Sequence, residues 1–338
     1  VSPPASGSED YTSTNVQERG VDESGKIKTD GAFFYVASDD AVQVVDISGP
    51  MTVVAAESVA GYVDGLYLYD NLLVVLYGLH GGGGGPWEDV EMPASERLFG
   101  MPYWIPTERR QGVAIYDISD PRNPMHRKTI EFDGHMVSSR LIKGRLHLVQ
   151  QFLPELPPLA YWYDGSPAAL EETVRANRNA IADMSLAQLI PHYREVNGLD
   201  DTPPESPLVT PENFYCPVSK NGGGTITTVV TFDLDDTALR FTSAGIVADA
   251  HIVYASQESL YTATRHFFFD AEVSEQTTLF RFDLSGERVR YMGGGVIAGW
   301  ILNQFSLGEY KAVLRVAATI GHAGGWGPTA SNQVYCLQ

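Results

Sequence analysis

The chain has 338 residues, a formal net charge of −19 at pH 7, and 43% hydrophobic residues. This length and hydrophobic content suffice for one large domain or two smaller ones with a buried core. An acidic surface repels nucleic-acid phosphates and anionic lipid, so neither is an expected partner, and no apolar run approaches the roughly 18 residues of a transmembrane helix.

The first residues have the composition of a leader. The opening VSPPASGSED is rich in Pro, Ser and Ala, which is typical of a linker between a removed signal or lipid anchor and a folded domain, although an artificial start would look the same. We therefore expect a flexible leader over residues 1–12 and an exported protein, whether extracellular, periplasmic or anchored at the cell surface. The two cysteines, Cys216 and Cys336, form no CxxC motif, and both a disulfide and two free buried thiols remain open.

A phrase that recurs four times determines the expected fold class. It reads apolar-apolar-Asp-apolar-polar at the end of an alternating strand: VVDIS at 44–48, IYDIS at 115–119, TFDLD at 231–235 and RFDLS at 281–285. Without two insertions, residues 78–110 and 152–223, the spacing approaches the roughly 40–50 residues of a four-stranded propeller blade. The pattern predicts an all-β fold, a β-propeller of about five antiparallel blades over residues 13–338, with a helical insertion. The repeated aspartate is expected to accept backbone N–H bonds in the following turn.

In chain order, the predicted strands are short, β-branched or aromatic, and separated by Gly, Asp or Asn turns. They group into blades at residues 25–59, 63–134, 135–247, 250–297 and 301–338. The fifth blade lacks its outer strand, which would leave unpaired edge amides and carbonyls. We expect TNVQERG, residues 14–20, to supply this strand and close the ring, and KIKTDG to be the innermost strand of blade one.

The two insertions differ in character. The first contains a run of five glycines without the Lys-Ser/Thr ending of a phosphate loop, which favours a surface excursion. The second predicts a helix with Ser166 as N-cap and Pro167 at its first position, running to Ala182. A second helix is expected over residues 185–196, kinked or broken by Pro191.

The candidate site residues are those that open the innermost strands, because loops entering these strands form the binding face of a propeller. The candidate ligand-binding residues are Asp64, His135, Arg140, His251, Asn303 and Gln304. The candidate metal ligands are the rim carboxylates Asp22, Glu23 and Asp30, which would suit Ca²⁺ although no twelve-residue calcium loop is present. His135 and His251 occupy similar places in their blades, and would bind a divalent metal, act as acid and base, or make structural hydrogen bonds. We find no GxSxG or HExxH motif and assign no catalytic residue and no certain cofactor.

Several phrases resemble a known family. They are TNVQERGVDESGKIKTDG, GRLHLVQQF after MVSSRLI, VYASQESLYTATRH and LNQFSLGEYKAVLRVAATIG. They are similar to secreted bacterial and archaeal proteins with a C-terminal β-propeller domain, from about residue 10 to the end. The resemblance implies a fold and an exported location, but no activity. Domains of that family continue past the point where this chain ends, which leaves the number of blades in the ring open.

Three functions are compatible with the sequence. The first is a secreted or cell-surface module that binds a protein or a glycan, favoured because catalytic motifs are absent and the insertions are long. The second is a metal-dependent hydrolase or lyase acting in the central channel through carboxylates and histidines. The third is a structural envelope component that assembles through the open edge of a blade.

Overall fold

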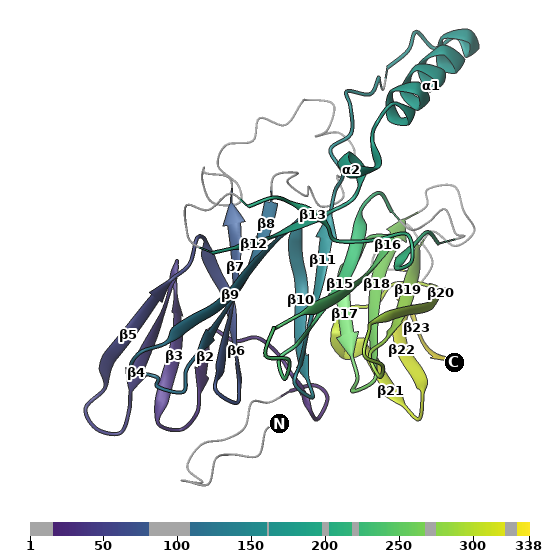
Figure 1. Cartoon of the computed structure of the whole chain (residues 1–338). Helices are drawn as coiled ribbons and strands as arrows, with labels where there is room; N and C mark the ends of the chain where they lie inside the picture. The colour runs from purple at the N-terminus through teal and green to yellow at the C-terminus, as the bar shows by residue number, and fades with distance from the viewer. Residues whose placement is uncertain are drawn as a thin grey trace.

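The strands form five successive sheets, arranged as the blades of a β-propeller (Figure 1). The computed structural model describes residues 16–80, 109–160, 162–197, 203–217, 223–267, 275–321 and 330–338. Within each blade, strands adjacent along the sheet pair antiparallel, apart from one short parallel pair in blade three. The predicted all-β class and the predicted blades are confirmed. The predicted leader, residues 1–12, and the five-glycine run lie outside the described residues.

Blades one, four and five are simple meanders whose strands follow chain order from the inner to the outer edge. Blade one contains β2 (Ile27–Thr29), β3 (Phe33–Ser38), β4 (Ala41–Asp46) and β5 (Thr52–Ser58). Blade four contains β17 (Ile252–Ala255), β18 (Ser259–Phe267), β19 (Glu275–Asp283) and β20 (Arg290–Ala298). Blade five contains the 3₁₀ turn η2 (Gln304–Ser306), β21 (Leu307–Tyr310), β22 (Val313–Ile320) and β23 (Ser331–Leu337).

Blades two and three are six-stranded because other segments add to their edges. Blade two contains β6 (Tyr62–Tyr69), β7 (Leu72–His80), β8 (Arg109–Asp117) and β9 (Met125–Asp133), extended by β12 (His192–Val196) and β13 (Ser206–Pro207). Blade three contains β10 (His135–Ile142), β11 (Arg145–Phe152), β15 (Ile226–Asp233) and β16 (Phe241–Val247), flanked by β1 (Val21–Asp22) and β14 (Phe214–Tyr215). Strands β7 and β8 therefore extend into both ends of the range expected for the first insertion.

The core lies between the blades, and central strands such as β7 are buried on both faces. In β7, Leu73, Val75 and Tyr77 pack against blade one, whereas Val74 and Leu76 pack against blade three. Fully burying a large apolar side chain stabilises a fold by about 1.5–3 kcal/mol. Apolar clusters of this kind join each blade to the next along the chain.

The repeated aspartates cap turns as predicted. One carboxylate oxygen of Asp46, Asp117, Asp233 and Asp283 accepts the backbone N–H two residues later, at 2.9 to 3.1 Å. The second oxygen of Asp117 accepts from Arg127 at 3.0 Å, and that of Asp283 accepts from Arg290 at 2.7 Å. Although partial burial acts in the opposite direction, hydrogen bonds from Ser285 and Arg290 lower the pKa of Asp283 to about 2. The recurring phrase is thus a structural device.

A cross-channel segment, residues 17–26, runs along the inner edges of four blades before blade one begins. Its contacts follow the blades in reverse order. At blade five, Gln17 Nε2 donates to the carbonyls of Gln304 (2.9 Å) and Leu307 (3.1 Å), and at blade four the Tyr254 hydroxyl donates to Glu18 (2.6 Å). At blade three, β1 pairs with β10, and at blade two, Gly25 forms a β-bridge with Leu66. The segment therefore ties the inner strands together.

The prediction that residues 14–20 form the outer strand of blade five is wrong for its described part, residues 16–20, which contains no strand. The physical reason is the burial of Val21, which is 3% exposed and belongs to the apolar cluster between blades three and four. Burying this side chain draws the segment to the inner edges. The innermost strand predicted for blade one is confirmed, because β2 pairs with β3.

The second insertion contains one substantial helix and contributes strands to two blades. Helix α1 (Pro167–Ala182) begins as predicted, with Ser166 accepting the N–H of Ala169, and it projects away from the blades (Figure 1). The predicted second helix is wrong beyond its first turn, because α2 (Leu186–Leu189) ends before Pro191 and β12 follows. Proline disfavours helical backbone at the residue before it, and β12 instead pairs with the outer edge of β9. None of the described helices is long and apolar enough to cross a membrane.

Both cysteines, Cys216 and Cys336, are free and exposed. The alternative of a disulfide is therefore not realised, and the expectation of buried thiols is wrong. Cys216 directly follows the edge strand β14, and Cys336 lies on the edge strand β23; neither belongs to a buried apolar cluster.

Candidate functional site

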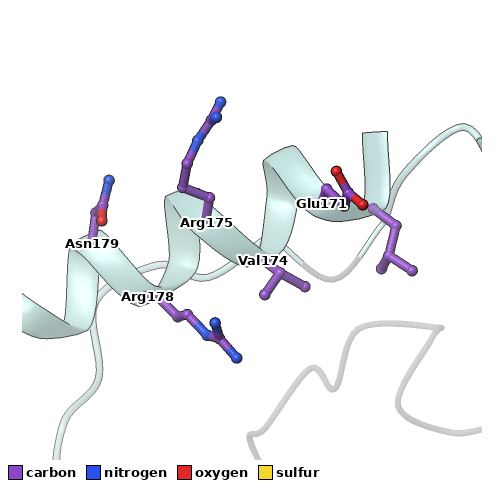
Figure 2. Close-up of a pocket in the computed structure, with 6 residues that line it drawn as sticks. Glu171, Val174, Arg175, Arg178 and Asn179 are labelled. Atoms are coloured by element: carbon purple, nitrogen blue, oxygen red, sulfur yellow. The ribbon is translucent and has the colours of Figure 1, made fainter. Parts of the chain in front are cut away.

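Helix α1 carries a shallow concavity that does not have the properties of a binding site. Its volume is about 410 Å³, and it is lined by Leu170, Glu171, Val174, Arg175, Arg178 and Asn179, all from α1. Figure 2 shows that Arg175 extends to one side of the helix while Val174 and Arg178 extend to the other. Polar groups that converge on one point are what fix a ligand in place, and this surface offers none.

A second cavity, about 320 Å³ in volume, lies where blades two and three meet at the insertion-bearing end. We call it the interblade cavity. It is lined by Asp64, Gly78, Leu79, Arg110, Gln111, His135 and Met136, contributed by β6, β7, β8 and β10. Two of these residues, Asp64 and His135, are sequence-predicted ligand-binding residues. The fold thus brings together positions that are distant in the sequence.

Two β-bulges shape the interblade cavity. The register between β6 and β7 shifts between Val63 and Gly65, so that Asp64 is the extra residue. The register between β10 and β11 shifts between Met136 and Ser138. The other three inner strands pair in regular register over their described residues. The two inner strands with bulges are thus the two that line the cavity. Bulges change the direction of side chains and are frequent beside binding sites.

A buried polar row supports the cavity from within blade two. Glu131 is 3% exposed and accepts a hydrogen bond from Arg194 Nε at 2.7 Å, and the hydroxyl of Tyr77 lies 3.4 Å from its other oxygen. Glycine at position 112 leaves room for the Tyr77 ring, because a Cβ there would lie 2.0 Å from it. Arg194 comes from β12, so the second insertion neutralises a carboxylate that blade two buries.

The charges around the cavity are compensated, with one exception. Arg110 forms salt bridges with Asp133, at 3.3 Å, and with Glu205 from the second insertion. The hydrogen bond from Arg110 lowers the pKa of the Glu205 carboxyl below its usual value. Asp64 is exposed and forms no salt bridge in the described part of the chain; its carboxylate accepts one long hydrogen bond, at 3.4 Å, from Gln111 Nε2. Of the carboxylates and guanidinium groups that the structure describes around the cavity, Asp64 is therefore the one without an ion pair.

A buried amide lies on the strand next to the cavity residue Met136. Gln150 on β11 is 1% exposed and pairs with Met136, which lines the cavity. It shares the face of Leu146 and Leu148, which pack toward blade two. Neither its amide nitrogen nor its amide oxygen has a hydrogen-bond partner among the described residues. Leaving a buried polar group unsatisfied costs about 1–3 kcal/mol.

Four sequence-predicted residues lie together elsewhere, around the cross-channel segment. Arg140 is 4% exposed; its guanidinium lies 3.3 Å from Glu23 and donates to Gln304 Oε1 at 2.7 Å. Gln304 Nε2 donates to Glu23 at 3.2 Å, and Asp22 pairs with Lys28 at 2.8 Å. These contacts hold the segment in place, because a buried guanidinium must be paired.

The remaining candidates are dispersed. Asp30 accepts backbone N–H bonds from Ala32 and Phe33 in its own turn, and Asn303 caps η2. His251 lies near Asp249; burial lowers the pKa of His251, and Asp249 partly offsets this effect. Within the described ranges, no group of three or more His, Cys, Asp or Glu residues is arranged to hold a metal ion. The calcium hypothesis thus gains no support from Asp22, Glu23 or Asp30.

Sequence reasoning missed Arg110, Gln111 and Gln150. Gln111 and Gln150 are buried amides in apolar strands, and such residues are uncommon enough inside strands to have served as a signal. Arg110 falls in the range that the sequence assigned to an insertion, which hid its place on β8. Their relation to Asp64 depends on pairing between blades, which a local pattern does not show.

Comparison with known proteins gives a result that agrees with this architecture. A family model described as "Beta propeller domain" matches residues 11–338 of the chain. No curated protein matches it significantly.

Proposed function

The chain belongs to the β-propeller domain family, and from this premise we propose that it is a binding module for a protein or a glycan, with the interblade cavity as its ligand site. One observation carries the proposal: both bulged inner strands line one cavity, and its carboxylate Asp64 forms no salt bridge among the described residues. The strand partner of the cavity residue Met136, Gln150, is a buried amide with no hydrogen-bond partner among those residues. Binding sites are concave and contain a few convergent polar groups on a rigid support. The interblade cavity has these properties, whereas the groove on α1 does not.

The test is a binding screen with a variant that blocks the cavity. Neutral saccharides, amines, carboxylates and short peptides are screened by thermal shift and then titrated calorimetrically. Asp64→Arg places a long side chain of opposite charge at the cavity mouth, and Glu258→Arg makes the same charge reversal at an exposed turn of blade four. We expect ligands that bind the wild type and Glu258→Arg but not Asp64→Arg. Ligands that bind all three proteins equally would show that the site lies elsewhere.

Two alternatives have weaker support. A metal-dependent hydrolase or lyase would need a cluster of ligands, and the channel residues that the sequence singled out include Arg140, Glu23 and Gln304, which are engaged by the cross-channel segment. A structural envelope component would use the outer edge of β23, which pairs only with β22 among the described strands. Sedimentation at high concentration distinguishes it, because edge pairing would produce concentration-dependent oligomers.

Export remains part of the proposal. It is supported by the composition of the first residues and by the resemblance of the sequence to secreted proteins. Expression of the natural gene in its host, followed by fractionation into cytoplasm, envelope and medium, tests it. Recovery of the protein in the cytoplasmic fraction alone would contradict it.

A further inference from the structure

We infer that the ligand of the interblade cavity is a neutral, polyhydroxylated molecule, of which a saccharide unit is the representative. This inference rests on the proposed function and names the chemical class of the ligand. Its basis is the donors and acceptors that line the cavity, their charges, and the buried amide of Gln150 paired with Met136.

The cavity mixes hydrogen-bond donors and acceptors within one small space. The Asp64 carboxylate only accepts, the Arg110 guanidinium only donates, and the Gln111 amide does both. A hydroxyl group both donates and accepts through a single oxygen atom. Adjacent hydroxyls on one molecule would therefore satisfy all three side chains, with one hydroxyl donating to Asp64 and another accepting from Arg110 or Gln111.

The distribution of charge disfavours ionic ligands. An anion would meet the uncompensated Asp64, and the nearby Arg110 is already paired with Asp133 and Glu205. An ammonium group would pair with Asp64 but would offer no acceptor to the amide N–H of Gln111. Burying a donor without a partner is costly, and a neutral ligand with alternating donors and acceptors avoids this cost.

Geometry agrees with a ligand of modest size. A volume of about 320 Å³ lies at the lower end of ligand pockets, which suits one sugar ring rather than an extended chain. Met136 and Leu79 supply apolar wall, against which the C–H face of a ring would pack. Gln150, the cross-strand partner of Met136 on β11, has no hydrogen-bond partner for either amide atom among the described residues, and it is the nearest further polar group that we expect to take part.

The experiment titrates the whole chain with D-glucose, D-galactose, D-mannose and N-acetylglucosamine, and separately with methylammonium and acetate, by ligand-observed NMR and calorimetry. Asp64→Asn keeps the shape of the side chain and removes its charge. Asp70→Asn makes the same change in the turn of the β6–β7 hairpin, at the end away from Asp64, where a positive φ of 46° suits asparagine. Gln150→Leu tests the buried amide, and thermal unfolding confirms that each variant is folded.

Support would be saturable binding of at least one of the saccharides, weakened tenfold or more by Asp64→Asn and unchanged by Asp70→Asn. A several-fold loss in Gln150→Leu would extend the site to the buried amide. If methylammonium or acetate binds at Asp64 and no saccharide does, the ligand class is wrong while the proposed site stands. If a saccharide binds equally to the wild type and to Asp64→Asn, or if no probe of any class binds, the inference fails.

Discussion

Replacement of the buried His147 should change how stability depends on pH. This residue lies on β11, is 2% exposed, and its Nδ1 lies 2.8 Å from the hydroxyl oxygen of Thr231. Burial, assisted by the positive charge of Arg145, lowers the pKa of His147 from 6.5 to about 3. The folded protein therefore holds this imidazole neutral at neutral and mildly acidic pH.

The magnitude follows from proton linkage. Below pH 6.5 the unfolded chain binds a proton at this position and the folded chain does not, so the stability that the neutral form contributes is lost progressively as pH falls toward 3. Each pH unit in this window costs about 1.4 kcal/mol. At pH 5.0, about 1.5 units below the unfolded value, the free energy of unfolding should have lost about 2 kcal/mol through this one residue.

The assay compares wild type with His147→Gln, which keeps a hydrogen-bonding side chain but does not titrate. Urea unfolding is followed by tryptophan fluorescence at pH 7.5, 6.0 and 5.0. Between pH 7.5 and 5.0 the wild type should lose about 2 kcal/mol more than the variant. If the two proteins lose the same amount, burial in blade three does not hold His147 neutral, and the reasoning from desolvation is refuted.

Three further changes test separate features. Gly112→Ala should destabilise the fold by about 1–3 kcal/mol, because its Cβ would lie 2.0 Å from the Tyr77 ring, whereas Gly49→Ala, with no atom within 4 Å, should not; equal thermal midpoints would contradict this. Asp283→Ala should cost about 1 kcal/mol at pH 7 and much less near pH 2, because its carboxylate has a pKa lowered to about 2 and its contribution is lost as pH falls from about 4; chemical denaturation at both pH values checks the sign. Ser166→Ala should speed amide exchange in α1 and leave the urea midpoint of the blades unchanged, since no residue of this helix is buried; a lowered midpoint would show that α1 packs on the propeller.

The parts of the fold that could be predicted are those with local causes. Asp46 and its three counterparts recur because a turn after each third strand needs an acceptor, and Ser166 with Pro167 marks a helix start for a similarly local reason. Pro191 also gave a local signal for the end of a helix. That the residues after it form a strand depends on a free sheet edge, which β9 provides.

The candidate site was predicted only in part, because its causes are not local. Asp64 was selected as a strand opener, and its actual role as a bulge residue depends on pairing with β7. Arg140 was selected for the same reason, yet its partner Glu23 reaches it only because Val21 is buried between blades three and four. No pattern along the chain records which blades meet, and this information decides which polar residues face a cavity.

The route of the cross-channel segment also imposes a schedule on the assembly of the protein. Gln17 leaves the ribosome long before the carbonyls to which it binds, which lie 287 and 290 residues later in the chain. These bonds cannot close before blade five is synthesised, so the peptide around Gln17 should stay sensitive to protease until synthesis has passed Leu307, whereas Val21 and Gly25 can dock earlier on blades three and two. Such late-closing bonds make the fastening of this segment to blade five a late step of maturation, and a protease pulse on stalled nascent chains of increasing length would reveal it as an abrupt gain of protection.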